Sequence, residues 1–255
     1  MRSSVRTTSD SDGRERSGRP QVCPSSDPGV PVRWPTVLVL ALDTATSAVV
    51  AGVAELTADG VVVRAQRVAQ EARRHGELLV PSLLEACAEA GVALRDAGAV
   101  VVGVGPGPFT GLRVGMVTAA ALGDALDVPV HGVGTLDAIA HDAGPGPRVA
   151  VTDARRREVY WAAYAADGAR TAGPHVDAPA VFRERIADLG VATAAGGSAA
   201  ESGLPVRGPA EPSVAALVAV AADALRAVVA PGPLEPLYLR RPDAAEPGAR
   251  KRVRT

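Results

Sequence analysis

Apolar, β-rich runs that end at polar turns occur twice along this chain, and they are the feature that most constrains its fold. Residues 37–42 (VLVLAL) are apolar throughout, which is typical of a strand buried on both faces, and they end at Asp43. Residues 149–152 form a second such run, which ends at Asp153. Further strand and helix patterns follow each run. We therefore expect an α/β fold of two related subdomains, with mixed sheets flanked by helices.

The spacing of apolar residues predicts the individual elements. The first half is expected to hold strands at 37–42, 48–55, 61–66, 99–104 and 128–133, and helices at 75–90, 112–126 and 135–143. The second half is expected to hold strands at 149–152, 158–165 and 191–195, and helices at 180–189 and 213–229. Gly91 predicts the end of the first helix and Ser213 the N-cap of the last, while His175 is expected in a loop.

The domain boundaries follow from composition. The Gly-Pro-Gly-Pro segment at 144–147 is the clearest linker, so we expect one subdomain at 37–143 and a second at 148–239. Residues 1–36 are rich in Ser, Arg, Pro and Gly and are expected to be disordered. Residues 240–255 carry six basic and two acidic side chains. A solvated, disordered tail is the favoured interpretation of this segment, with an RNA contact as the alternative.

Charge and cysteine content exclude several classes of protein. The chain has 27 Lys+Arg against 28 Asp+Glu, which argues against a domain that holds nucleic acid by bulk electrostatics. Two cysteines, Cys23 and Cys87, are too few for a disulfide framework or a four-thiolate zinc site, and they suggest free thiols in a reducing compartment. No apolar run has the pattern of a secretory signal or a membrane span, so we expect a cytoplasmic protein without a membrane contact.

Two segments could carry chemistry. Asp43, at a strand end, could hold a hydrated cation or a phosphate-linked water; the alternative is a turn residue whose side chain binds the backbone two residues on. The glycine-rich segment 105–111 joins a strand to a helix N-terminus, where free N–H groups favour anions. The segment has neither the spacing of a Walker loop nor that of a dinucleotide-binding loop. A tight connection without a ligand is therefore as well supported as an anion-binding loop. Thr110 or Gly111 is expected to cap the helix, with Arg113 in its first turn.

Metal and nucleophile patterns are missing from the sequence. His75 is followed at the fourth position by Leu79, and His131 and His141 are ten residues apart, so no histidine pair has ligand spacing. No Gly-x-Ser-x-Gly elbow occurs and neither cysteine has a neighbouring histidine, so we expect no metal and few reactive side chains. Residues 153–158 (DARRRE) form a charge-dense hairpin turn, for which a solvated tip is the default interpretation and an interaction site the alternative.

Four motifs in register resemble a known family. They are LALDTAT at 40–46, GVGPGPFTGLR at 103–113, DARRREVY at 153–160 and PLYLR at 236–240. Together they resemble the bacterial tRNA threonylcarbamoyladenosine biosynthesis family TsaB, also called YeaZ, over roughly residues 37–243. One departure is Pro108, where the family usually has Ser; proline removes a hydroxyl and an N–H from the glycine-rich segment.

The resemblance implies a fold and a role. The fold would be actin-like and sugar-kinase-like (ASKHA, RNase H-like). The role would be that of a non-catalytic scaffold subunit that forms a heterodimer with TsaD and acts with the ATPase TsaE. That complex transfers a threonylcarbamoyl group to N6 of the adenosine beside the anticodon in tRNAs reading ANN codons.

The resemblance also bears on cofactors and rival functions. The chain would have no cofactor of its own, while the complex uses ATP, Mg and threonylcarbamoyl-adenylate and is the route to tRNA. Homodimerisation of the free chain is left open. The alternative functions are an actin-fold ATP-dependent small-molecule kinase that uses Asp43 and a glycoprotease-like hydrolase.

Site residues follow residue by residue from the resemblance. The family pairs through its first two helices, here 75–90 and 112–126. In the second, small residues recur every four positions and would allow close helix approach; packing inside the subunit is the alternative. The expected partner-binding residues are His75, Leu79, Leu83, Leu112, Gly115, Ala119, Leu122 and Gly123. A degenerate nucleotide cleft would involve Asp43, Thr44, Gly105, Gly107, Thr110 and Arg113.

Overall fold

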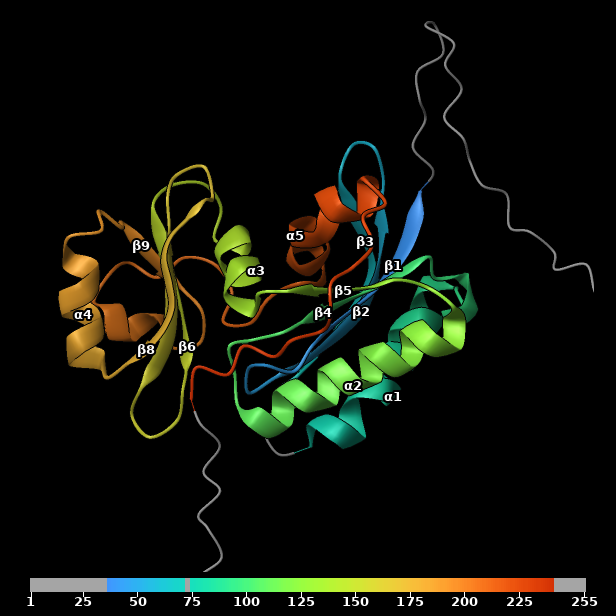
Figure 1. Cartoon of the computed structure of the whole chain (residues 1–255), viewed down its shortest axis with the longest axis horizontal. Coiled ribbons are helices and arrows are strands. Elements are labelled where there is room, and N and C mark those ends of the chain that lie inside the picture. Colours follow the sequence, from blue (N-terminus) through green and yellow to red (C-terminus); the bar gives the residue numbers. More distant parts are fainter. Residues whose placement is uncertain (1–35, 72–73, 241–255) are drawn as a thin grey trace, which may run out of the picture. The chain divides into compact units, whose positions relative to one another are not determined.

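The computed structural model describes residues 36–71 and 74–240. The predicted disordered extension and the basic tail therefore lie outside the described residues, except for Thr36 and Arg240. The described residues belong to one compact unit, and they form two β-sheets with helices packed on them (Figure 1). No helix in these two ranges is both long and apolar enough to span a membrane.

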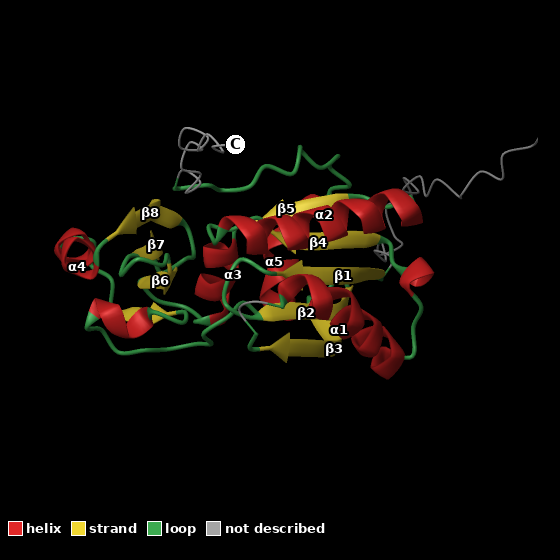
Figure 2. Cartoon of the chain, turned by 90° about the horizontal axis from the view of Figure 1, so that it is seen from below, coloured by secondary structure: helices red, strands yellow, loops and turns green. Residues whose placement is uncertain are grey.

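The first sheet has five strands. They are β1 Val37–Asp43, β2 Val49–Leu56, β3 Val61–Ala69, β4 Ala99–Gly103 and β5 Val130–Val133. Their spatial order is β3-β2-β1-β4-β5 (Figure 2). The pairs β1–β2 and β2–β3 are antiparallel, whereas β1–β4 and β4–β5 are parallel. The sheet is therefore mixed, with a meander at one side and parallel strands at the other.

Helices cover both faces of this sheet. Leu40 and Leu42 of β1 belong to the core cluster formed with α1 (His75–Ala90) and α2 (Phe109–Leu126). The intervening Val39 and Ala41 belong to the cluster formed with α5 (Val214–Arg226), which lies on the other side of the sheet (Figure 1). Because both faces are buried, β1 is apolar at every position before Asp43 instead of alternating with polar residues.

The second sheet has four strands. They are β6 Arg148–Asp153, β7 Val159–Tyr164, β8 Arg170–Asp177 and β9 Thr193–Ala195, in the order β8-β7-β6-β9. The pairs β6–β7 and β7–β8 are antiparallel and β6–β9 is parallel. One face of the sheet packs with α4 (Pro179–Ala187) and the other with α3 (Thr135–Asp142).

The two sheets share a connection pattern. In each, the first strand pairs antiparallel with the second and parallel with the fourth, and the second pairs antiparallel with the third. This repeat confirms the predicted fold class of two related mixed sheets flanked by helices. However, α5 packs on the first sheet although it follows the second sheet in the chain. The boundaries 37–143 and 148–239 stay a prediction.

Two elements differ from the sequence prediction. Strand β8 was not predicted, and it places His175 in a sheet instead of a loop; its Gly173-Pro174 pair, two typical strand breakers, hid the pattern. Helix α2 begins at Phe109, three residues before the predicted start, with Pro108 as its N-cap. The predicted caps Thr110 and Gly111 therefore lie inside the helix, and Arg113 lies in its second turn. This prediction was wrong because proline sets the helix entry here.

Two predicted helix ends are confirmed. Gly91 ends α1 in the left-handed conformation, at φ 68°. The Ser213 hydroxyl accepts a hydrogen bond from the Ala216 N–H at 3.0 Å and caps α5. Asp142, the last residue of α3, in turn accepts hydrogen bonds from the Ser213 N–H and hydroxyl at 2.7 and 2.8 Å, so the end of α3 fixes the start of α5.

Residues 227–240 follow α5 as an extended segment that contacts both cores. Leu234 packs against the cluster of the first sheet, and Leu239 packs against the α3 side of the second. Between them, the Leu237 N–H donates to the Val104 carbonyl at 2.9 Å. This segment contains the PLYLR motif, whose apolar residues thus serve packing.

Candidate functional site

Asp43 lies at the end of β1 and is completely buried. Its Oδ1 accepts a hydrogen bond from the Ala45 N–H at 2.9 Å, and its Oδ2 accepts one from the Thr135 hydroxyl at 2.6 Å. A Cβ at Gly103 would overlap with the carboxylate, so only glycine fits at the end of β4. The hydrogen bond from Ala45 is the one expected of a turn residue, which was the alternative to a ligand-binding Asp43 in the sequence analysis. The Asp43 side chain also has no exposed surface that a ligand could contact.

Burial dominates the electrostatics of this carboxyl. It raises the pKa of Asp43 from 3.8 to about 6, although the hydrogen bonds from Thr135 and from the backbone of Ala45 and Thr46 lower it. The cause is the loss of hydration of the charged form, which two or three hydrogen bonds replace only partly. Asp43 is therefore a buried acid that titrates close to neutral pH.

Thr44 joins the same turn to α2. Its hydroxyl donates to the Gly111 carbonyl at 2.7 Å and accepts from the Gly115 N–H at 3.0 Å, so it contacts both members of one i, i+4 backbone pair of the helix. A Cβ at Gly115 would overlap with this hydroxyl, and one at Gly111 would lie 2.6 Å from the Thr44 carbonyl oxygen. The glycines let α2 approach the turn closely.

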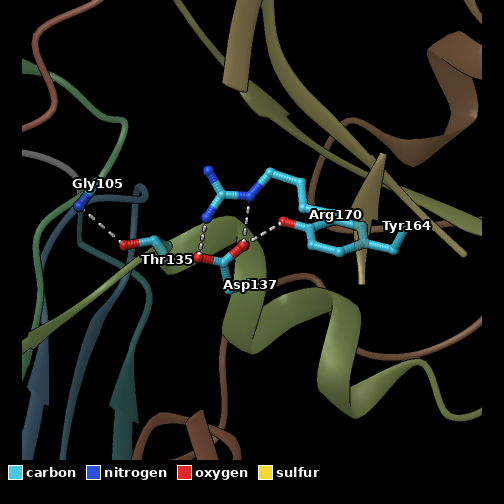
Figure 3. Close-up of polar contacts among 5 residues, drawn as sticks. All are labelled: Gly105, Thr135, Asp137, Tyr164 and Arg170. Atoms are coloured by element: carbon cyan, nitrogen blue, oxygen red, sulfur yellow. Dashed lines mark hydrogen bonds and ion pairs between the residues drawn. The ribbon is translucent and has the colours of Figure 1, made fainter. Parts of the chain in front are cut away.

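The remaining glycines of segment 105–111 are buried as well. A Cβ at Gly107 would overlap with the Ala45 backbone, and one at Gly105 would lie 2.9 Å from the Leu112 side chain. The Gly105 N–H donates to the Thr135 hydroxyl at 3.3 Å (Figure 3). The segment is thus a tight connection around the turn at 43–45. Its buried glycines do not fit the cradle that a nucleotide phosphate would need.

The start of α2 carries an aromatic stack. Phe109 stacks on Tyr238 with ring centroids 5.1 Å apart, and the Arg113 guanidinium lies 4.3 Å from the centroid of the Phe109 ring. Phe109 is 37% exposed, and no side chain caps the helix N-terminus. Of the residues predicted for a nucleotide cleft, Thr110 and Arg113 are thus the exposed ones, whereas Asp43, Thr44, Gly105 and Gly107 are buried.

His75 begins α1 and packs against the turn of its own chain. It is 8% exposed, and its Nε2 lies 3.2 Å from the Thr46 carbonyl oxygen. Among the described residues, no group of three or more His, Cys, Asp or Glu side chains is arranged to hold a metal ion.

Most of the predicted partner-binding residues face inward. Besides His75, six of them are buried in their own subunit: Leu79, Leu83, Leu112, Gly115, Ala119 and Gly123. Gly123, for example, abuts Val130 of β5, where a Cβ would overlap. The prediction that the strip of small residues faces a partner is therefore wrong, because this strip seats α2 on its own sheet. Leu122 is half-buried.

The outer faces of the same helices expose other apolar side chains. Val80 and Leu84 of α1 are 43% and 47% exposed, and Val117 of α2 is 67% exposed. The two helices run side by side over one face of the first sheet (Figures 1 and 2). Apolar groups at such positions are available to a partner, whereas the buried strip is not.

Two small cavities lie beside the turn at 43–47. The first, of about 70 Å³, is lined by Thr46, Ser47, Pro108, Thr152, Asp153, Arg155, Gly197, Ser198, Ala210 and Glu211. The second, of about 250 Å³, is lined by Thr46, His75, Gly76, Pro108, Thr110, Gly111, Val114 and Arg155. The Thr152 hydroxyl is buried and has no hydrogen-bond partner among the described residues. Both cavities are smaller than typical ligand pockets of roughly 300–1,000 Å³.

A half-buried carboxylate on α3, that of Asp137, helps to connect the two sheets, and sequence reasoning missed it. Asp137 accepts hydrogen bonds from the Tyr164 hydroxyl at 2.8 Å and from the Arg170 guanidinium at 2.7 and 3.1 Å (Figure 3). Burial and the neighbouring Asp137 raise the pKa of Tyr164, which therefore stays protonated and donates. Thr135, two residues earlier, binds Asp43 at the first sheet. A polar first turn after Gly134 is the only sequence signal for this connection.

Comparisons with known proteins match the chain to two named families and to uncharacterized relatives. Residues 63–208 match the family described as TsaD: tRNA N6-adenosine threonylcarbamoyltransferase. An uncharacterized protein of Mycobacterium tuberculosis is 52% identical over 209 residues, which cover 81% of this chain and 93% of that protein. The tRNA threonylcarbamoyladenosine biosynthesis protein TsaB of Escherichia coli is 38% identical over 133 residues, which cover 51% of this chain and 55% of that protein.

Solved structures extend the similarity to the fold. YeaZ from Pseudomonas aeruginosa is 30% identical, with a TM-score of 0.63 and coverage of 80% of this chain and 100% of that one. A second structure from the same organism, described as an uncharacterized protein with similarity to peptidase YEAZ, is 31% identical, with a TM-score of 0.62 and the same coverage.

Proposed function

We infer the function from the premise that this chain belongs to the TsaB (YeaZ) family. It takes part in the biosynthesis of threonylcarbamoyladenosine in tRNA. Within that process, we propose that it is the non-catalytic scaffold subunit, which binds TsaD as a heterodimer and acts with the ATPase TsaE. The ATP, Mg and threonylcarbamoyl-adenylate of the reaction would then be handled by the other subunits, and this chain would need no cofactor.

The surroundings of Asp43 support a non-catalytic role. Asp43 and Thr44 are at most 1% exposed, and the polar atoms of their side chains form hydrogen bonds with their own turn, α2 and α3. A kinase that used Asp43 would have to present this carboxylate to a substrate, which would require breaking the bond to Thr135 and moving α2 away. A packed turn is instead suited to holding helices in place.

The outer face of α1 and α2 is the observation that carries the scaffold proposal. Val80, Leu84 and Val117 are large apolar side chains exposed on two adjacent helices, whose inner faces are fully used in the core. An interface core is typically apolar, with few charges. We propose that TsaD packs on this face, which replaces the buried strip in the sequence-based hypothesis.

Val117→Arg tests the docking face. In co-expression with TsaD from the same organism, the variant should lose co-purification, because a buried, unpaired guanidinium is costly at an interface. Its thermal unfolding should match that of the wild-type chain, since Val117 is 67% exposed in the free subunit. Val206→Arg is the matched control, because Val206 is 56% exposed and lies outside α1 and α2.

Retained pairing in Val117→Arg, with pairing intact in the control, would place the interface elsewhere. The rival functions are checked on the isolated chain. Micromolar Mg-ATP binding with turnover of a small substrate would favour a kinase, and chelator-sensitive proteolysis would favour the hydrolase. We expect neither activity.

A further inference from the structure

The hairpin between β6 and β7 has an unusual tip. Arg155, Arg156 and Arg157 are consecutive, exposed, and all in the left-handed region, with φ of 61°, 52° and 63°. Residues with a Cβ rarely adopt this conformation, and glycine or asparagine would turn the chain with less strain. Three arginines in a row at such positions indicate that their side chains, and not the turn geometry, are what this segment supplies.

The two acidic residues of the hairpin itself are already engaged. Asp153 accepts the Arg155 N–H at 2.8 Å and pairs with its guanidinium at 3.2 Å. Glu158 forms an ion pair with Arg240 in the C-terminal segment. Arg157 makes no hydrogen bond or ion pair with any residue that the structure describes. Among the described residues, the guanidinium of Arg157 is therefore available to an anion.

More positive charge and an aromatic pair lie near the tip. Arg155 lines both cavities beside Pro108, which is the N-cap of α2. Arg113 lies in the second turn of that helix, against the ring of the exposed Phe109. The charge of the tip is opposite to that of the chain around it. Residues 37–239 hold 15 Arg and no Lys against 22 Asp+Glu, so this part of the chain is acidic overall and three consecutive arginines are an exception within it.

We propose that this basic tip, Arg155–Arg157 together with Arg113, binds the phosphate backbone of RNA. The proposal rests on the role in tRNA modification and adds a direct RNA contact by this subunit. Guanidinium groups bind phosphate oxygens in a bidentate fashion. Phe109 holds Arg113 in place within this group, since the guanidinium lies 4.3 Å from the centroid of its ring.

The geometry favours RNA over a small anion. Of the three tip arginines, Arg155 lines the two cavities described above, which measure about 70 and 250 Å³. A small phosphorylated ligand would need several groups converging on one enclosed site. Exposed arginines at consecutive positions of a hairpin tip suit a strand of successive phosphates instead.

Fluorescence anisotropy with a labelled tRNA transcript tests the contact, on both the full chain and its complex with TsaD. Arg155→Gln/Arg156→Gln/Arg157→Gln should weaken binding roughly tenfold or more and lower the slope of log affinity against log salt by about two. The control Arg95→Gln/Arg183→Gln/Arg207→Gln removes the same charge from exposed positions on other elements. It should change the affinity by less than about twofold, since only local charge contacts the phosphates.

Two results would overturn the proposal: wild-type affinity in the tip variant, or an equal loss in both variants, which would indicate bulk electrostatics. If the triple variant does not fold by circular dichroism, Arg157→Glu decides, because Arg157 is exposed and makes no ion pair within the described chain. Tight binding of inorganic phosphate or ADP at the tip without binding of tRNA would also overturn it. TsaD co-purification is scored separately, so failure of pairing and failure of RNA binding are distinguishable.

Discussion

Asp43 shows how much a single side chain depends on its surroundings. At the end of a strand it could have faced solvent and a ligand, but the turn at 43–45 folds back, and α2 and α3 close over it. The carboxylate then links the end of β1 to the start of α3 through Thr135. Its burial raises the pKa to about 6, so the charge that forms this link is costly near neutral pH.

Asp43→Asn should flatten the pH dependence of stability. The pKa is higher in the folded chain, about 6 against 3.8, so the folded state binds the proton more tightly. Protonation therefore stabilises the fold below about pH 4, and this contribution, of about 3 kcal/mol, is lost as the pH rises through 6. Denaturant unfolding between pH 4 and 7.5 should show this fall in the wild type and lack it in the variant.

Asp153→Asn is the control for removal of a carboxylate, since Asp153 ends the equivalent strand of the second sheet but is exposed. The control should follow the wild-type pH profile. Parallel pH profiles for the wild type and Asp43→Asn would contradict the burial argument.

At the scale of elements, α2 is positioned by contacts with the turn at 43–45. Thr44 binds two backbone groups of the helix, and the absence of a Cβ at Gly111 and Gly115 makes that approach possible. The recurrence of small residues every four positions is the same signal that a helix–helix interface gives. Here it serves a helix on its own sheet, which is why the pattern was assigned to the wrong neighbour.

Gly115→Ala should destabilise the chain by about 1–3 kcal/mol, because the added methyl overlaps with the Thr44 hydroxyl and must displace α2. Gly76→Ala in α1 is the matched control. A Cβ there meets no atom within 4 Å, so the variant should be neutral or up to about 1 kcal/mol more stable. Urea unfolding checks both, and equal stability of the two variants would refute the packing role of Gly115.

At the scale of the whole molecule, segments that are distant in sequence make contacts with both sheets and connect them. Helix α3 contributes Thr135 to the first sheet and Asp137 to the second, and α5 returns to the first sheet after the second is complete. The extended segment 227–240 then places Leu234 in one core and Leu239 in the other. Both sheets are therefore expected to unfold in one cooperative transition.

Leu234→Ala and Leu239→Ala test this coupling. Each side chain is half-buried, so each variant should lower the unfolding free energy by about 1–2 kcal/mol. Each should also leave a single transition in thermal unfolding followed by tryptophan fluorescence and by far-UV circular dichroism. Val229→Ala, at a 55% exposed position of the same segment, should have little effect. Separate transitions for the two probes would show that the sheets unfold independently.

Local chemistry made much of the fold predictable from the sequence. A strand buried on both faces must be apolar at every position, so 37–42 and 149–152 were recognisable, and glycine or serine at helix ends has a local physical reason, as Gly91 and Ser213 show. Strand β8 was not predictable in this way, since Gly173 and Pro174 interrupt its pattern and pairing with β7 stabilises it.

Which face of a helix points inward was decided by the tertiary structure alone. Periodicity identifies a stripe of small or apolar residues on α1 and α2, but it contains no information about what the stripe contacts. The turn at 43–45, some seventy residues away from Gly115, determines that contact. The burial of Asp43 and the position of Arg155 beside the start of α2 are of the same kind, because each depends on atoms brought together only when distant segments pack.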